Sequence, residues 1–128
     1  MQPRWIIIHC SDVSYRTAYD QLSAIENYHR SQMFPISSLG YHTGYQHLIT
    51  GGKNYECRRD NEIGAHCNTV VNGLSMNEQS LGVCVGFDGD IEYMPQDWYD
   101  LLQKQVWAWQ DKHNIPDERV KFHRYFAT

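Results

Sequence analysis

Two apolar runs along the chain predict strands that are buried on both faces. The first extends from Arg4 to Cys10 and contains three consecutive isoleucines. The second extends from Ser80 to Phe87 and is followed by the turn Asp88-Gly89-Asp90. Continuous apolar runs of this length are typical of strands in a sheet that is covered on both sides.

A first stretch with apolar residues at helical spacing covers residues 18–32. Leu22, Ile25 and Tyr28 fall on one stripe, whereas Asp20 and Glu26 are expected to point outward, so we expect an amphipathic helix here.

A second helix is predicted to begin at Pro95 and to be terminated by residues 114–116, which include Asn114 and Pro116. Its apolar stripe consists of Trp98, Leu101, Leu102, Val106 and Trp109.

Between these helices, the glycine pair Gly51-Gly52 separates two β-type runs, 45–50 and 54–58, and predicts a tight hairpin. Residues 119–123 form the last predicted strand. The order β, α, β, β, β, α, β predicts an α/β (α+β) fold with a central mixed sheet flanked by helices. The length of 128 residues favours a single domain, 1–128.

Composition narrows the classes of function. Hydrophobic residues make up 41% and charged residues 20%, as in ordinary globular proteins. The net charge of -4 and the lack of a Lys/Arg run argue against nucleic acid as a partner. No apolar run is long enough for a signal peptide or a membrane span, so we expect a protein made in the cytoplasm, without a membrane partner. We also expect a monomer. The same compartment favours free thiols at the four cysteines.

His9 and His123 are the first candidates for chemistry, because each closes a predicted strand. Binding crevices in open α/β sheets lie beyond the carboxyl ends of the strands. If these two strands are neighbours, both imidazoles project into one cleft. Two neutral imidazoles suit Zn²⁺, although a catalytic zinc ion takes three protein ligands and a water. For His9 alone, the other interpretation is a core histidine that is hydrogen-bonded to the backbone.

Other nucleophiles and ligands are weighed against this pair. His42, His47 and His66 are third-ligand candidates by type, whereas His29 and His113 are expected to be solvated. A Cys10 or Ser11 nucleophile next to His9 is disfavoured, because adjacent strand residues point to opposite faces.

Five sequence blocks occur in a fixed order over nearly the whole chain. They are Ile6 to Ser11, Gly44 to Ile49, Glu62 to Cys67, Gln79 to Cys84 and Phe122 to Arg124. Together they resemble the type 2 N-acetylmuramoyl-L-alanine amidases, a family that includes phage lysis amidases, bacterial cell-wall amidases and peptidoglycan recognition proteins. The resemblance implies a mixed sheet with helices around it and a zinc site in an open groove. It also implies hydrolysis of the amide bond between N-acetylmuramic acid and L-alanine in peptidoglycan or muropeptides.

The resemblance also implies roles for four residues. His9 matches the first zinc ligand and His123 the second. Tyr45 matches the tyrosine that assists the zinc-bound water and the tetrahedral intermediate, with Tyr41 as the alternative. His66 matches a histidine of the groove wall that contacts the substrate or supports the site.

The chain departs from the family pattern at two places. Gln46 stands where the family usually has histidine, and His47 where it usually has an aromatic residue. In the family, a lysine and a Cys or Asp ligand follow the second histidine, and the matching positions would lie after Thr128. We therefore expect either a fragment that ends before them, which we favour, or a form without full zinc coordination, and weak zinc binding by the 128 residues. Two other functions remain open: a non-catalytic peptidoglycan-binding module of the same fold, and a zinc hydrolase that acts on another amide.

Overall fold

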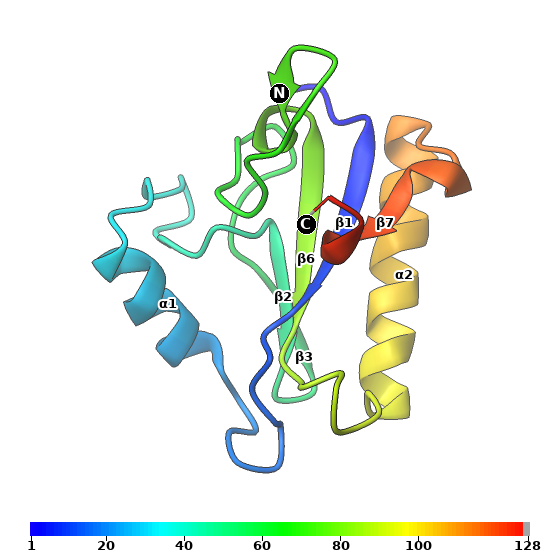
Figure 1. Ribbon diagram of the computed structural model, residues 1–128. Helices are drawn as coiled ribbons and strands as arrows, with labels where there is room; N and C mark the ends of the chain where they lie inside the picture. Colours follow the sequence, from blue (N-terminus) through cyan, green and yellow to red (C-terminus); the bar gives the residue numbers. More distant parts are fainter. Residues whose placement is uncertain (127–128) are drawn as a thin grey trace.

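A five-stranded mixed sheet forms the centre of the computed structural model, which describes residues 1–126 (Figure 1). Its strands are β1 (Trp5–Cys10), β2 (His47–Thr50), β3 (Lys53–Glu56), β6 (Ser80–Val85) and β7 (Val120–Phe122). The order across the sheet is β3-β2-β6-β1-β7. β1 is parallel to both β6 and β7, β2 is parallel to β6, and only β3 runs antiparallel to its neighbour. The predicted fold class is therefore confirmed.

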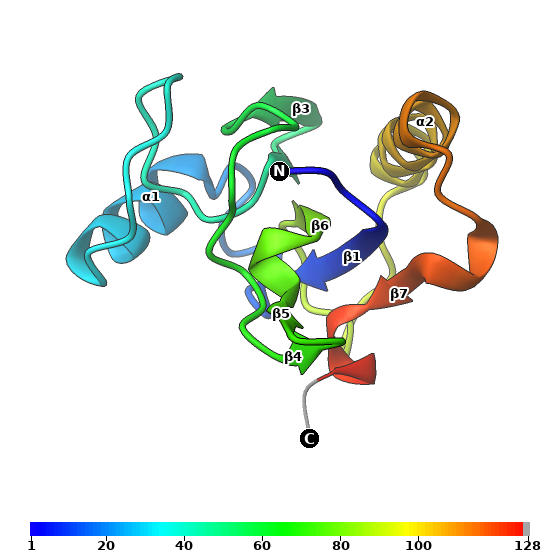
Figure 2. The same ribbon diagram turned by 90° about the horizontal axis from the view of Figure 1, so that it is seen from above.

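Two helices flank the sheet on opposite sides, as Figure 2 shows from above. They are α1 (Leu22–Ser31) and α2 (Gln96–His113). The long loop after β3 contains a small hairpin of β4 (Val70–Val71) and β5 (Leu74–Ser75). Short 3-10 turns complete the fold: η1 (Met76–Glu78), η2 (Asp117–Arg119) and η3 (His123–Tyr125). The helix α2 ends where Asn114 adopts the left-handed conformation, as its sequence predicts.

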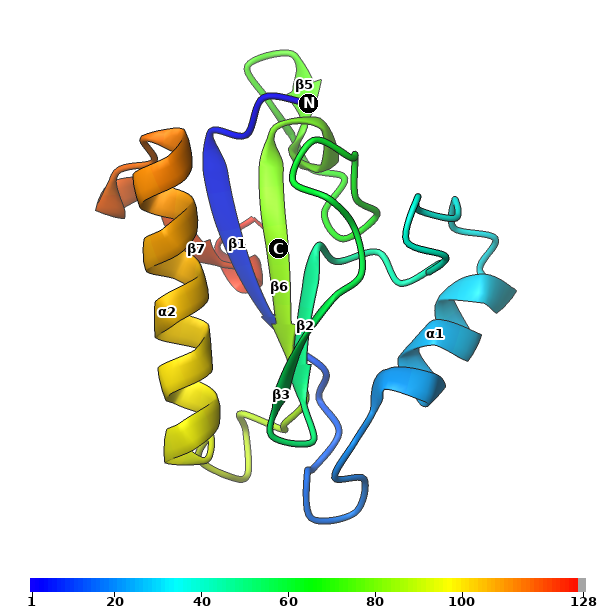
Figure 3. The same ribbon diagram turned by 180° about the vertical axis from the view of Figure 1, so that it is seen from behind.

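The alternation of side chains along the central strands separates two faces. Ile6 of β1 and Val83 of β6 pack with Trp98 and Leu102 of α2 in the main apolar core. Figure 3 shows α2 alongside β1 from behind. Residues next to them in sequence point the other way, because successive strand residues face opposite sides. His9 is therefore on the face away from α2, beneath α1 and the long loop.

The first helix differs from its prediction in length and in which of its side chains are buried. It begins at Leu22, because the preceding Gln21 is tied to the hairpin by a hydrogen bond from its N–H to Thr50 Oγ1 (2.9 Å). Tyr28 is 62% exposed, while His29 is only 8% exposed, so the prediction of a solvated His29 is wrong. Glu26 was expected to point outward, but it accepts hydrogen bonds from the segment after Tyr41.

The hairpin and the later strands follow the predicted pattern closely. Gly51 and Gly52 have φ values of 60° and 75°, which glycine adopts without the strain of a side chain. β7 ends at Phe122, which is 57% exposed. All four cysteines are free. In the described part of the chain, no helix combines the length and apolar character needed to cross a membrane.

Candidate active site

His9 and His123 come together because the strands that carry them are neighbours. β1 and β7 pair in parallel, and His123 follows the last residue of β7, at the start of η3. The two rings are stacked, with centroids 4.6 Å apart and an interplanar angle of 30°. The expectation that both strands bring their histidines to one place is confirmed. His9 is buried, with 6% of its surface exposed, whereas His123 is half-buried.

His66, from the loop after β3, contacts His9 directly. Its Nδ1 lies 2.9 Å from Nε2 of His9. The hydroxyl of Ser80 donates to the carbonyl of Met76, so toward His66 Nε2, at 3.4 Å, the Ser80 oxygen acts as the acceptor. His66 therefore carries its proton on Nε2, and its bare Nδ1 accepts a hydrogen bond from His9 Nε2. This arrangement leaves Nδ1 of His9 as the nitrogen with a free lone pair.

Glycines and one asparagine make room for His66 and hold its loop. A Cβ atom on Gly82 of β6 would lie 2.7 Å from the His66 ring, and one on Gly64 would meet the same ring at 2.7 Å. Asn77 Oδ1 accepts hydrogen bonds from the backbone N–H groups of His66 and Cys67, at 2.7 and 2.8 Å. The imidazole is thus laid against β6 beside His9.

The ring of Tyr45 packs against that of His9, with the ring centroids 5.0 Å apart. Its ring lies 6.4 Å from that of His66. Tyr41 and Tyr45 both pack on the apolar cluster that includes Leu48 and Cys84, but among the described residues no contact is found between the rings of Tyr41 and His9. The geometry therefore favours Tyr45 over Tyr41 for a role beside His9. We call His9, Tyr45, His66 and His123 the His9 cluster.

The segment before Tyr45 is held from both sides. Glu26 of α1 accepts hydrogen bonds from the N–H groups of His42 and Thr43, at 2.8 Å each, and from the Thr43 hydroxyl at 2.7 Å. His29 Nδ1 accepts from the N–H of Gly44, at 2.9 Å. These contacts were not anticipated from the sequence, from which Glu26 was expected to point outward and His29 to be solvated.

Arg58 completes this support from the opposite side. Its guanidinium is almost fully buried and donates to the carbonyl of Thr43 at 2.9 Å and to that of His42 at 3.2 Å. The backbone that leads into Tyr45 therefore has both its N–H and its C=O groups fixed, which limits the positions open to the phenol ring.

Burial sets the protonation of the cluster. Desolvation lowers the pKa of His9 well below its ordinary value, and the neighbouring His66 and His123 lower it further. Burial is also the main cause that lowers the pKa of His66, to about 3, and the pKa of His123. Burial raises the pKa of Tyr45 well above its ordinary value. At neutral pH the cluster thus presents neutral imidazoles, which can bind a metal, and a protonated phenol, which can donate.

A cavity of about 320 Å³ opens beside the cluster. It is lined by Phe34, Ala65, His66, Cys67, Asn68, Asn77 and His123. The mixture of amide, imidazole and apolar surface suits a ligand with both peptide and polar groups.

The donor set fits zinc as a two-histidine half-site. His9 and His123 supply neutral imidazoles, of the type that zinc prefers. His66 does not join them as a third ligand in this arrangement, since the three rings do not bring their ligand atoms within 4.8 Å of one another. Its contact with His9 instead resembles the outer hydrogen bonds that orient metal-binding histidines.

The two departures at the start of β2 have different outcomes. Gln46 is fully buried, and its Oε1 accepts from the N–H of Gly82 (2.7 Å) while its Nε2 donates to the carbonyl of Glu62 (2.9 Å). It therefore ties β6 to the loop that carries His66. His47 points to the other face of the sheet, where its ring contacts that of Trp109.

Comparison with known proteins gives one family. Residues 1–128 match the family model of the N-acetylmuramoyl-L-alanine amidases. No curated protein matches the chain. Among solved structures, the N-acetylmuramoyl-L-alanine amidase LysC from Clostridium intestinale URNW is similar with a TM-score of 0.78 and 20% identity, over 100% of this chain and 74% of that one.

Peptidoglycan recognition proteins of insects share the same fold. Wild-type Drosophila PGRP-LB has a TM-score of 0.74 and 22% identity, over 98% of this chain and 72% of that one. PGRP-SA of Apis mellifera has a TM-score of 0.71 and 22% identity, over 100% of this chain and 75% of that one. With the family match over its whole length and this shared fold, the chain belongs to the N-acetylmuramoyl-L-alanine amidase family.

Proposed function

We propose that the protein is a zinc-dependent N-acetylmuramoyl-L-alanine amidase, which hydrolyses the amide bond between N-acetylmuramic acid and L-alanine in peptidoglycan. One observation carries the proposal: the rings of His9 and His123 are stacked at 4.6 Å, with the Tyr45 ring 5.0 Å from His9. These residues come from three distant segments of the chain. Membership of the amidase family supports the same function.

His9, through its free Nδ1, and His123 would hold the zinc ion. When bound, the ion supplies a Lewis acid for the carbonyl oxygen and a water of lowered pKa as the nucleophile. His66 accepts the Nε2 proton of His9 and so fixes the tautomer that keeps Nδ1 bare. His66 is therefore proposed as a positioning residue for His9 as well as a contact for the substrate in the adjoining cavity.

Tyr45 is proposed to stabilise the charge that develops on the carbonyl oxygen. Its phenol remains protonated, because burial raises its pKa well above the ordinary value. A phenol donor beside the carbonyl would contribute more here than in water, because the site is shielded from solvent. The hydrogen bonds of Glu26, His29 and Arg58 to residues 42–44 hold the backbone that positions this donor.

Family and fold support the substrate class. A Drosophila PGRP-LB mutant of this fold was solved in complex with tracheal cytotoxin. The cavity beside His66 and His123 would receive the junction of sugar and peptide, with Asn68 and Asn77 at its wall.

A product analysis tests the proposal. Purified muropeptide is incubated with the protein and Zn²⁺, and the products are identified by mass spectrometry. We expect a free stem peptide that begins with L-alanine and a muramoyl sugar with a free lactyl carboxylate. Saturable binding of muropeptide without any cleavage would instead support the non-catalytic binding module, and cleavage at a different amide would support another hydrolase of this fold.

A further inference from the structure

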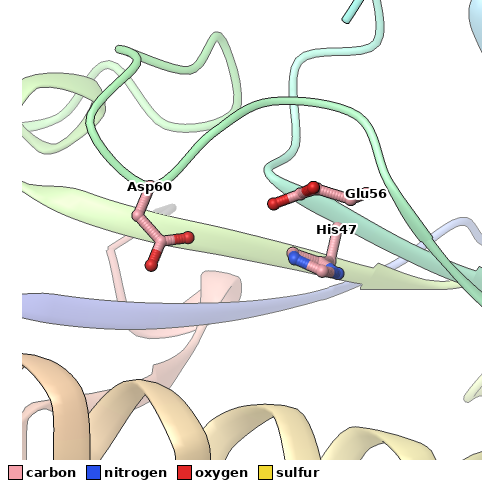
Figure 4. Close-up of side chains that lie close together, drawn as sticks. All are labelled: His47, Glu56 and Asp60. Atoms are coloured by element: carbon pink, nitrogen blue, oxygen red, sulfur yellow. The ribbon is translucent and has the colours of Figure 1, made fainter.

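A second group of possible metal ligands lies on the opposite face of the sheet from His9. His47 at the start of β2 and Glu56 at the end of β3 are direct partners in the antiparallel pair, and Asp60 follows in the next loop. One ligand atom from each of the three lies within 4.8 Å of the other two. Figure 4 shows the three side chains near one another. Among residues 1–126, no other three His, Cys, Asp or Glu side chains bring their ligand atoms this close together.

We propose that His47, Glu56 and Asp60, here called the His47 cluster, bind a divalent transition-metal ion such as Zn²⁺, separately from the proposed catalytic ion. The site goes beyond the proposed amidase function. One imidazole and two carboxylates form a mixed nitrogen and oxygen set that suits zinc, whereas Mg²⁺ and Ca²⁺ prefer oxygen ligands alone. Two carboxylates also neutralise the charge of a divalent ion.

His47 is oriented as a ligand by its neighbours. Its Nδ1 lies 2.7 Å from Oδ1 of Asn54, an oxygen that can only accept, so the ring proton is on Nδ1 and Nε2 is bare. Asn54 is fixed in turn, because its Nδ2 donates to Oε1 of Gln105 in α2 at 2.9 Å. Burial also lowers the pKa of His47, so the imidazole is neutral at pH 7. A hydrogen-bonded second nitrogen is a common feature of histidines that bind metals.

Asp60 is held as a carboxylate by three donors. Oδ1 accepts from Trp109 Nε1 at 3.2 Å, and Oδ2 accepts from His113 Nε2 at 2.9 Å and from Lys112 Nζ at 3.1 Å. Burial alone would raise the pKa of Asp60, but these hydrogen bonds outweigh it and the pKa is lowered. The carboxylate is therefore ionised, with an unshared lone pair on Oδ1.

Glu56 is free to complete the site. It is exposed, and its contact with Arg59 Nη1 at 3.4 Å is a surface ion pair, which typically contributes about 0–1 kcal/mol. Zinc bonds to oxygen of about 2.0–2.2 Å require the ligand atoms to move closer together, and rotation of this exposed side chain can bring its carboxylate toward His47 and Asp60. The cluster opens to a cavity of about 840 Å³, through which the ion and its water ligands can enter.

A bound ion would join β2, β3 and the loop that leads toward His66. A ligand that binds only the folded state stabilises it in proportion to the logarithm of its concentration over Kd. Zinc is therefore expected to raise the melting temperature through this site. An ordinary ion-pair network at the same residues would give no such metal dependence.

The test removes the proposed catalytic ligands first. In a His9→Ala/His123→Ala protein whose folding is verified by circular dichroism, isothermal titration with Zn²⁺ should show one ion per chain and a raised melting temperature. Adding His47→Ala should abolish this binding. Adding Glu56→Gln, at an exposed position that folding tolerates, should weaken it at least tenfold. X-ray absorption of the bound zinc should show a single imidazole with oxygen ligands.

Two controls separate a site from general attraction of cations. His113→Gln keeps an N–H donor near Asp60 and removes a histidine from the same cavity, so it should leave zinc binding within about threefold. Mg²⁺ at the same concentration should not raise the melting temperature. The proposal is overturned if the protein without His9 and His123 binds no zinc, or if His47→Ala and Glu56→Gln bind it as tightly as their parent.

Discussion

His29 of α1 accepts a hydrogen bond, at 2.9 Å, from the backbone N–H of Gly44, the residue directly before Tyr45. The rings of His29 and Tyr45 are 5.5 Å apart. This relationship connects a helix on one side of the sheet to the phenol beside His9. A buried histidine that accepts from the backbone must be neutral at the accepting nitrogen, and burial lowers the pKa of His29 accordingly.

Replacement of His29 should affect both stability and the placement of Tyr45. His29→Leu leaves the buried N–H of Gly44 without an acceptor, which typically costs about 1–3 kcal/mol. Urea unfolding of the variant should show a loss in this range. Tyr28→Leu, on the exposed side of the same helix, is the matched control and should change stability by less than about 0.5 kcal/mol. Equal effects of the two substitutions would mean that His29 does not hold the segment.

Gly82 is predicted to be essential for the contact between His9 and His66. A Cβ at Gly82 would lie 2.7 Å from the His66 ring, so Gly82→Ala must displace that ring. We expect altered imidazole NMR signals for both histidines and loss of most amidase activity in a protein that still folds. Gly89→Ala should be tolerated, because a Cβ there meets its nearest atoms at 3.7 Å or more. Unchanged imidazole signals in Gly82→Ala would contradict the arrangement.

Glu26 predicts a specific pH dependence of stability. Burial alone raises its pKa, but hydrogen bonds from His42 and Thr43 outweigh this and lower the pKa from 4.5 to about 2. The unfolded chain therefore takes up a proton near pH 4.5 and the folded chain only near pH 2, so stability is present above this window and is lost as the pH falls through it. The slope from one such group is at most about 1.4 kcal/mol per pH unit.

The measurement compares the protein with Glu26→Gln between pH 7 and pH 3 by urea unfolding. The variant should be less stable at pH 7 by about 1.5–3 kcal/mol, the usual contribution of hydrogen bonds to a charged group, and the difference should shrink below pH 4.5. Other carboxylates titrate in both proteins, so only the difference reports on Glu26. A difference that stays constant with pH would contradict the lowered pKa.

The sequence predicted the sheet well because its strands are marked by local patterns. The apolar runs that form β1 and β6, the Gly51-Gly52 turn and the stripe of α2 each depend on neighbours in sequence. These features are determined by periodicity and turn chemistry, which are readable along the chain. That β1 and β7 are neighbours was the condition under which His9 and His123 would share a cleft, and their parallel direction was not predicted.

The supporting contacts of the site could not be predicted in the same way. Glu26 and His29 look like ordinary polar positions of an amphipathic helix, and only the tertiary fold places the 42–44 backbone against them. One local signal was available: a glycine inside a strand, such as Gly82, often marks the close approach of another group. The identity of that group, His66, depends on a long loop whose path has no sequence period.

Steady-state kinetics of Tyr45→Phe test most directly whether the His9 cluster performs the hydrolysis. The substitution keeps the ring and its packing and removes only the phenol donor, so kcat for muropeptide cleavage should fall by about a hundredfold to a thousandfold while KM stays within a few-fold. Tyr41→Phe should retain the parent rate within a few-fold. An unchanged kcat in Tyr45→Phe, or an equal loss in both variants, would contradict the assignment of Tyr45 to the reaction.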